Sequence, residues 1–196
     1  MFNRSKYGKL LKIVLIISII AVAGIVVVAG YRMYNSYYIT TGATEAVSKF
    51  EQAIQAGGNI TTKYNEFTVI GTIQIPKIDL KYPILEENDV KALENAPVLM
   101  YSSQGLNNPG NSVIMGHNYR NKIMFSNLNK LAKGDYLYIT DNTGRNMKYK
   151  IYNIYEDSTN ENTYITRNTE GKKEITLSTY NNENKAKIII FARSEQ

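Results

Sequence analysis

The sequence of 196 residues contains no cysteine, no tryptophan, one histidine and four prolines. Without cysteine the chain has no disulfide, no thiol nucleophile and no cysteine-ligated zinc. A single histidine excludes a multi-histidine metal site within one chain, and no acidic cluster has calcium-loop spacing. We therefore expect neither a metal nor a cofactor. The length gives room for one ordinary domain and an appendage.

Basic residues outnumber acidic ones by 23 to 17, but the excess is confined to the N-terminus. Five of the basic residues and none of the acidic ones lie within residues 1–32, so the remainder of the chain is nearly neutral. A nucleic-acid-binding protein would instead carry a basic patch on its folded domain. The charge distribution therefore argues against a nucleic-acid partner.

An apolar segment at residues 13–30 has no charged side chain, and Ser18 is its only polar one. As a helix it would measure roughly 27 Å, close to the ~30 Å hydrocarbon layer of a membrane. The preceding basic residues are Arg4, Lys6, Lys9 and Lys12. The positive-inside rule then predicts a cytoplasmic tail over 1–12, a single transmembrane anchor over 13–31 in the cell membrane, and an extracellular C-terminal domain. A cleaved signal peptide is the alternative, with residues 28–30 as a weak cleavage site.

Two further patterns follow the anchor. Residues 32–65 are expected to form a stalk, with helical spacing of apolar residues over 44–56. From residue 66 to 196, short runs rich in Val, Ile, Thr and Tyr alternate with turn residues, which favours an all-β, closed barrel of seven to eight strands with short helices. The expected strands are 69–75, 81–85, 112–115, 136–140, 146–155, 174–179 and 186–192, and the expected short helices are 88–95 and 123–131.

The only histidine, His117, follows the apolar run 112–115 after a glycine. A histidine at a strand end lies at the rim of a sheet, where it can act as an acid, a base or an ion-pair partner. Alone, such a residue is more often an ordinary surface histidine. A second segment, Thr176-Leu177-Ser178-Thr179-Tyr180, also ends a strand, and Lys187 lies at the start of the last strand.

Together these segments resemble the sortases, which are membrane-anchored cysteine transpeptidases of Gram-positive bacteria that attach surface proteins to the cell wall or to one another. The family pattern has a Gly-His strand end, a Thr-Leu-Ser-Thr-Cys strand end and an Arg on the next strand. The resemblance extends from about residue 67 to the C-terminus, and segments 108–118 and 124–128 look most like class B or class D members. It implies a sortase barrel over 66–196, with a sorting-signal peptide of a surface protein or pilin as partner.

The resemblance also implies roles for single residues. His117 falls on the catalytic His, Tyr180 on the nucleophilic Cys and Lys187 on the Arg. In the family a thiolate attacks the peptide carbonyl, and the acyl-thioester then passes its acyl group to an amine. A phenol has a pKa of ~10 against ~8.5 for a thiol, and its oxygen lies at the far end of a ring. Lys187 keeps the positive charge of the family's Arg but lacks its planar fork of donors. Arg193 is no substitute, because it lies roughly 20 Å further along the strand.

The residues before Tyr180 offer another nucleophile. Ser178 is expected on the same face as Tyr180 and Thr179 on the opposite face, since side chains alternate along a strand. A Ser178–His117 pair is chemically feasible, although serines in such strands usually hydrogen-bond within the barrel. We also expect Ser178 and Thr179 to contribute to substrate binding.

Three functions remain open at this point. The first is a sortase-family protein at the outer face of a Gram-positive cell that has lost transpeptidation, a pseudo-sortase, and still binds a sorting signal or a partner such as an active sortase. The second is a functional cysteine-transpeptidase type protein, for surface-protein anchoring or pilin linkage, that carries a nucleophile substitution. The third is a tethered β-domain outside this family with a structural or adhesive role.

Overall fold

The computed structural model describes residues 4–57, 62–119, 123–157, 162–181 and 186–195. The chain divides into two compact units, Met1–Tyr38 and Ile39–Gln196. Helix α1 (Arg4–Gln55) contributes to both units. In the first unit the apolar side chains of residues 13–28 are exposed on all sides of the helix. Among the described residues this is the one helix long and apolar enough to cross a membrane, in agreement with the expected anchor.

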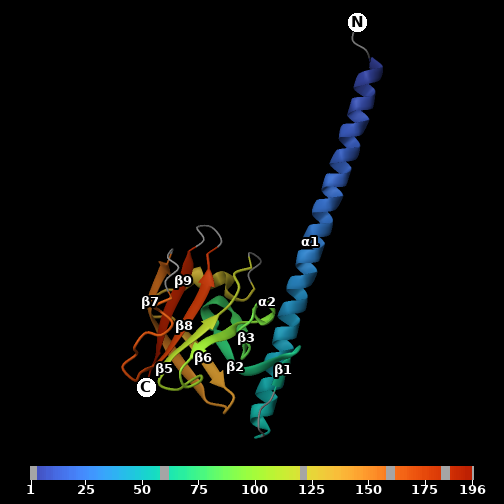
Figure 1. Ribbon diagram of the computed structural model, residues 1–196. Coiled ribbons are helices and arrows are strands. Elements are labelled where there is room, and N and C mark those ends of the chain that lie inside the picture. The colour runs from blue at the N-terminus through green and yellow to red at the C-terminus, as the bar shows by residue number, and fades with distance from the viewer. Residues whose placement is uncertain (1–3, 58–61, 120–122, 158–161, 182–185, 196) are drawn as a thin grey trace. The chain divides into compact units, whose positions relative to one another are not determined.

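The second unit is a closed β-barrel (Figure 1). Eight strands close through the β2–β6 pairing in the order β2-β3-β4-β5-β8-β9-β7-β6, and a short strand β1 is added beside β2. The pairs β3–β4 and β5–β8 are parallel, and the others are antiparallel. The strands in the described residues are β1 (Thr62–Tyr64), β2 (Phe67–Ile75), β3 (Leu80–Leu85), β4 (Val98–Ser102), β5 (Gly110–Met115), β6 (Tyr136–Asp141), β7 (Asn146–Asp157), β8 (Lys173–Tyr180) and β9 (Lys187–Ser194). The predicted closed barrel is confirmed.

Short helices connect some of these strands. Helix α2 (Val90–Asn95) begins where the Asp89 carboxylate accepts a hydrogen bond from the Ala92 amide at 2.8 Å, which is a standard N-cap. The segments η1 (Pro76–Ile78) and η2 (Phe125–Lys130) are 3-10 helices, so the helix expected over 123–131 is present in a tighter form. The helix expected over 44–56 is the last part of α1, and its Phe50 is fully buried in the core of the second unit.

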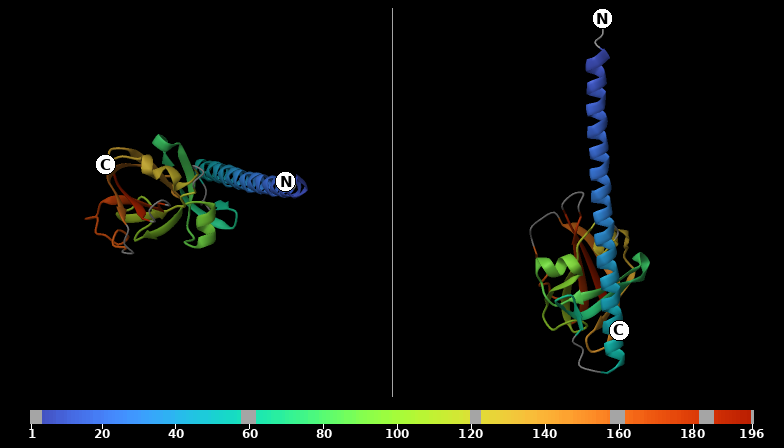
Figure 2. Two further views of the ribbon diagram at one scale, coloured as in Figure 1. Left: turned by 90° about the horizontal axis from the view of Figure 1, so that it is seen from above. Right: turned by 90° about the vertical axis from the view of Figure 1, so that its right-hand side faces the viewer.

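The alternation of side chains along β8 and β9 separates two apolar clusters. Ile175 and Leu177 belong to the main core, which fills the inside of the barrel. The view from above in Figure 2 shows the strands surrounding this interior. On the other face, Val113, Ile189 and Tyr164 form a second, smaller cluster. Tyr164 comes from the segment between β7 and β8, so this segment covers the outer face of the sheet that leads to His117 and Tyr180.

Candidate active site

The three residues expected at the catalytic positions belong to neighbouring strand ends. His117 lies two residues beyond the end of β5, and the parallel pairing of β5 with β8 places Met115 opposite Ser178. The antiparallel pairing of β8 with β9 places Tyr180 directly opposite Lys187. The topology therefore brings the backbones of these three residues to one end of the barrel.

Three hydrogen bonds join the ends of β5 and β8. The Gly116 amide donates to the Ser178 carbonyl at 3.2 Å, and the Thr179 hydroxyl donates to the Gly116 carbonyl at 2.7 Å. The Asn118 side-chain amide donates to the Tyr180 carbonyl at 2.9 Å. Because these bonds lie on both sides of His117, the rim around the imidazole has a defined backbone geometry.

His117 is half-buried and packs against Tyr119, with ring centroids 4.9 Å apart and planes tilted by 41°. Its carbonyl accepts a hydrogen bond from the Phe125 amide at 3.1 Å. Burial lowers the pKa of His117 below its usual value of 6.5, and the charge of Glu94 opposes this only in part. The imidazole is therefore neutral at pH 7 and available as a base or hydrogen-bond acceptor.

This lowered pKa predicts a pH dependence of stability. The unfolded chain binds the imidazole proton more tightly than the folded one. The contribution of neutral His117 to the free energy of unfolding is therefore fully present above pH 6.5 and is lost as the pH falls through the folded-state pKa. In untagged protein, NMR of the only imidazole should give a midpoint below 6.5. Urea unfolding between pH 7.5 and 5 should show a smaller loss of stability in His117→Gln than in the wild type. A midpoint above 6.5 would contradict this assignment.

Tyr180 and Lys187 have opposite environments although their backbones are paired. The Tyr180 side chain is 52% exposed, whereas Lys187 is only 7% exposed. The Lys187 ammonium donates to the Asn162 side-chain carbonyl at 2.9 Å and lies 5.8 Å from the centroid of the Tyr164 ring. The segment before β8 therefore covers the lysine and occupies at least one of its three donors.

The hydroxyls of Ser178 and Thr179 both contact other polar groups of the barrel domain. Each residue is 1% exposed. The Ser178 hydroxyl lies 3.4 Å from the Tyr164 hydroxyl on the outer face, and the Thr179 hydroxyl bonds to Gly116 on the other face. The expected alternation of the two side chains is present. Ser178 is thus a buried, hydrogen-bonded group rather than an open nucleophile beside His117.

Arg193 lies at the far end of β9. It is paired with Glu174 in the strand register, six positions from the Lys187–Tyr180 pair, and its guanidinium binds the Glu174 carboxylate at 2.7 Å. It cannot reach the rim where His117 lies, as the count along the strand predicted.

Gly116 has a packing role in the Gly-His strand end. A Cβ atom at this position would lie 2.7 Å from the ring of Phe125, which is fully buried. We expect Gly116→Ala to lower the free energy of unfolding by about 1–3 kcal/mol through overpacking. Urea denaturation of the full chain in detergent micelles measures this loss, and Phe125→Leu in the same chain should recover part of it. Additive losses in the double variant would show that the two residues do not clash.

The sequence alone did not indicate Asn118, Asn162 or Tyr164. Asn118 follows the histidine in an ordinary polar stretch, and the other two lie between strands without a recognisable pattern. Their contacts with Tyr180, Lys187 and Ser178 arise only when distant segments are brought together by the barrel. No local sequence signal identifies such contacts.

The fold is a closed eight-stranded β-barrel with His117, Tyr180 and Lys187 at neighbouring strand ends, and comparison with known proteins identifies the family. Residues 73–195 match the Sortase domain, and the chain belongs to the sortase family. The alternative of a β-domain from outside this family is therefore wrong.

Several relatives are similar over much of this chain. Sortase A of Bacillus anthracis is 32% identical over 112 residues, which are 57% of this chain and 51% of that protein. Sortase A of Streptococcus agalactiae is 29% identical over 143 residues, which are 69% and 56% of the two chains. The chain thus spans about half the length of the curated relatives that it matches.

Solved structures support the same conclusion. A sortase D5 transpeptidase from Clostridium perfringens superposes with a TM-score of 0.63 at 25% identity, covering 80% of this chain and 98% of that one. Sortase A from Corynebacterium diphtheriae gives a TM-score of 0.60 at 27% identity, covering 66% and 62%. Because these relatives carry different class letters, the comparisons establish the family and do not select class B or class D.

Proposed function

We propose that this protein is a pseudo-sortase that has lost transpeptidation. It binds a sorting-signal peptide or a partner protein with the end of the barrel at which His117 and Tyr180 lie. One observation carries the proposal: a chain without cysteine has an exposed tyrosine, Tyr180, at the strand end where the family has its nucleophile. A tyrosine hydroxyl lies at the far end of its ring, so the oxygen is displaced by the length of the ring from the position that a cysteine sulfur would occupy.

Two other features support the loss of activity. The Ser178 hydroxyl, the nearest alternative nucleophile along the strand, is buried against Tyr164. Lys187, which stands at the position of the family's Arg, is covered and hydrogen-bonded to Asn162. A single ammonium also lacks the bidentate geometry with which Arg stabilises an oxyanion. The nucleophile and the oxyanion-binding cation are thus both altered.

The features that favour retained binding lie around the same rim. Tyr180 is exposed, and His117 and Tyr119 form a partly exposed aromatic pair beside it. Aromatic side chains of this kind often dominate contacts with peptides. A sortase C from Clostridium perfringens has been solved with the C-terminal cell wall sorting motif, which indicates the kind of ligand that a barrel of this fold accommodates.

The localisation belongs to the same proposal. The apolar part of α1 anchors the protein in the cell membrane, and the four basic residues before it keep the N-terminus in the cytoplasm. The barrel is then outside a Gram-positive cell, where sorting signals and active sortases are available to it. Ser178 and Thr179 contribute to the binding site by fixing the backbone of β8 rather than by free hydroxyls.

Peptide binding is tested with the full chain in detergent micelles. Fluorescein-labelled sorting-signal peptides of sortase substrates are titrated with wild-type protein, and fluorescence anisotropy gives Kd. We expect saturable binding without cleavage, and Tyr180→Ala should weaken it about tenfold, as loss of a central aromatic contact does. The exposed Tyr152, on the outside of β7, provides the matched control, and Tyr152→Phe should leave Kd unchanged. Equal affinity for Tyr180→Ala and wild type would place binding elsewhere.

A further inference from the structure

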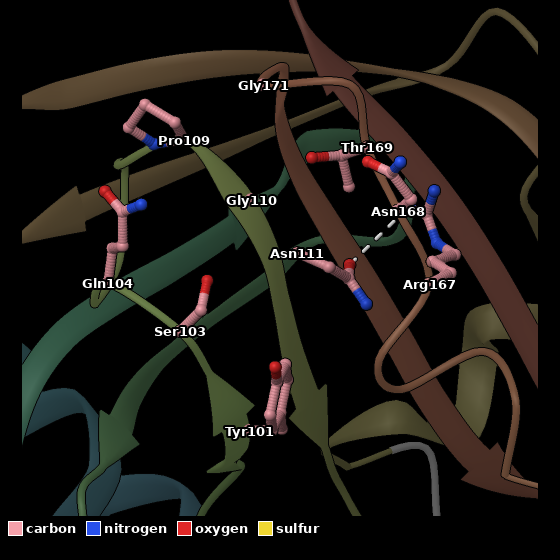
Figure 3. Close-up of a pocket in the computed structure, with 10 residues that line it drawn as sticks. All are labelled: Tyr101, Ser103, Gln104, Pro109, Gly110, Asn111, Arg167, Asn168, Thr169 and Gly171. Carbon is pink, nitrogen blue, oxygen red and sulfur yellow. Dashed lines mark hydrogen bonds between the residues drawn. The ribbon is translucent and has the colours of Figure 1, made fainter.

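A polar pocket lies at the other end of β5 from His117 (Figure 3). Its volume is about 260 Å³. Asn111 lines it, and the six residues from Asn111 to His117 correspond to roughly 20 Å of extended strand, so the pocket is separate from the rim described above. Its walls come from the end of β4, the β4–β5 connection and the segment before β8. The lining residues are Tyr101, Ser103, Gln104, Pro109, Gly110, Asn111, Arg167, Asn168, Thr169 and Gly171.

Two hydroxyls that line this pocket have no hydrogen-bond partner among the residues that the structure describes. Thr169 is only 6% exposed, yet neither its hydroxyl nor that of Ser103 makes a hydrogen bond within the described part of the chain. In Figure 3 the Thr169 hydroxyl points across the pocket toward Gly110. A Cβ atom on Gly110 would lie 2.7 Å from the Ser103 hydroxyl oxygen, so the absence of a side chain at Gly110 leaves room for this oxygen. Neither hydroxyl is among the buried side-chain atoms that lack a partner, so solvent reaches both, and both are free to donate a hydrogen bond to a ligand oxygen in the pocket.

The charge at the pocket wall is positive. The Arg167 guanidinium stacks on Phe191 at 4.1 Å, and one of its terminal nitrogens binds Glu174 and also donates to Asn111 at 3.4 Å. Its Nε is buried and is the one buried side-chain nitrogen or oxygen without a partner among the described residues. No residue lining the pocket is acidic.

Glu174 does not neutralise this positive charge fully. Its carboxylate is completely buried and also accepts hydrogen bonds from Arg193 at 2.7 Å and from the Tyr152 hydroxyl at 2.8 Å. One negative charge is therefore shared between two guanidinium groups, which leaves an excess positive charge. Arg167 lines the pocket and Arg193 does not.

We propose that this pocket binds an oxyanion, a carboxylate or phosphate group, through Arg167 with the Thr169 and Ser103 hydroxyls as further donors. Guanidinium groups favour both anions because their donors match planar and tetrahedral oxygens, and hydroxyl donors add charge-assisted hydrogen bonds. The site would hold an anionic group about 20 Å from the rim at His117, so its occupancy does not depend on transpeptidation or on the binding of a sorting signal.

The test uses isotope-labelled full chain in detergent micelles, observed by NMR at the side-chain amides of Asn111 and Asn168. Inorganic phosphate represents the phosphate source, and N-acetyl-glycyl-glycine with a free carboxylate represents the carboxylate source. The same dipeptide as its C-terminal amide is the neutral control. We expect saturable shifts with at least one of the two anions and none with the amide, and the anion with the lower Kd identifies the preferred chemistry. The absence of saturable shifts with both anions would overturn the proposal.

Matched variants locate the site. Arg167→Lys keeps the charge but loses the fork, and we expect Kd to rise about tenfold. Arg193 binds the same Glu174 but does not line the pocket, so Arg193→Lys is the matched control. We expect it to change Kd by less than about twofold. Thr169→Val removes the unpartnered hydroxyl with little change of shape and should also raise Kd, which keeps the proposal testable if Arg167→Lys does not fold. Wild-type affinity in Thr169→Val and in a folded Arg167→Lys protein would contradict the assignment.

Discussion

The double variant Tyr180→Cys with Lys187→Arg is expected to acquire transpeptidase activity at least about 10³-fold above the wild-type background. The cysteine supplies a nucleophile that a neighbouring base can activate, and the arginine supplies two parallel donors for the oxyanion. His117 is neutral at pH 7 and lies beside the same strand end, so it can accept the thiol proton. Intact-mass spectrometry should show an acyl-enzyme with a sorting-signal peptide, and chromatography should show transfer to an added amine.

Two matched variants separate the contributions to this activity. Tyr180→Cys alone should form the acyl-enzyme about 10²–10³-fold more slowly, because the oxyanion then lacks the arginine. Adding His117→Ala to the double variant should remove most of the remaining rate. If the double variant folds and its cysteine reacts with iodoacetamide but no acyl-enzyme forms, the peptide groove itself has changed, and the proposal of retained sorting-signal binding fails.

Replacement of the buried Glu174 should have the largest effect on stability. Its side chain is fully buried and binds Arg167, Arg193 and Tyr152. Glu174→Gln leaves two guanidinium groups without their counter-charge, and we expect the free energy of unfolding to fall by about 3 kcal/mol. Urea denaturation of the full chain in detergent micelles, followed by tyrosine circular dichroism, measures this change.

An exposed glutamate provides the control for this experiment. Glu170 pairs with Lys172 at 3.3 Å, but its side chain is 76% exposed. Glu170→Gln should therefore change the free energy of unfolding by less than about 0.5 kcal/mol. Similar losses in the two variants would show that burial does not determine the effect of the Glu174 carboxylate.

The barrel was largely predictable because its strands obey local rules. Alternation along 174–179 placed Ser178 and Thr179 on opposite faces, and their partners Tyr164 and Gly116 lie on opposite faces. Strand β4 (Val98–Ser102) was missed because Val98 to Tyr101 is a short apolar stretch without alternation, which periodicity does not distinguish from other buried segments. Strand β1 is only three residues long and gives no pattern.

The candidate site was predictable in its strand ends but not in its surroundings. The motif order indicated which residues meet at the rim, and the count along β9 placed Arg193 at the far end. The burial of Lys187 was not predictable, because it depends on Asn162 from a connecting segment. The pocket at Arg167 and Thr169 was not predictable for the same reason, since both residues lie between strands.

The native chain is expected to form no covalent bond to its peptide ligand. The most direct measurement is intact-mass spectrometry of the wild-type full chain after incubation with sorting-signal peptides at concentrations that saturate binding. We predict an unchanged protein mass, intact peptides and no effect of added hydroxylamine. A peptide–protein ester on Tyr180 or Ser178, released by hydroxylamine, would contradict this expectation and show that the native chain has a working nucleophile.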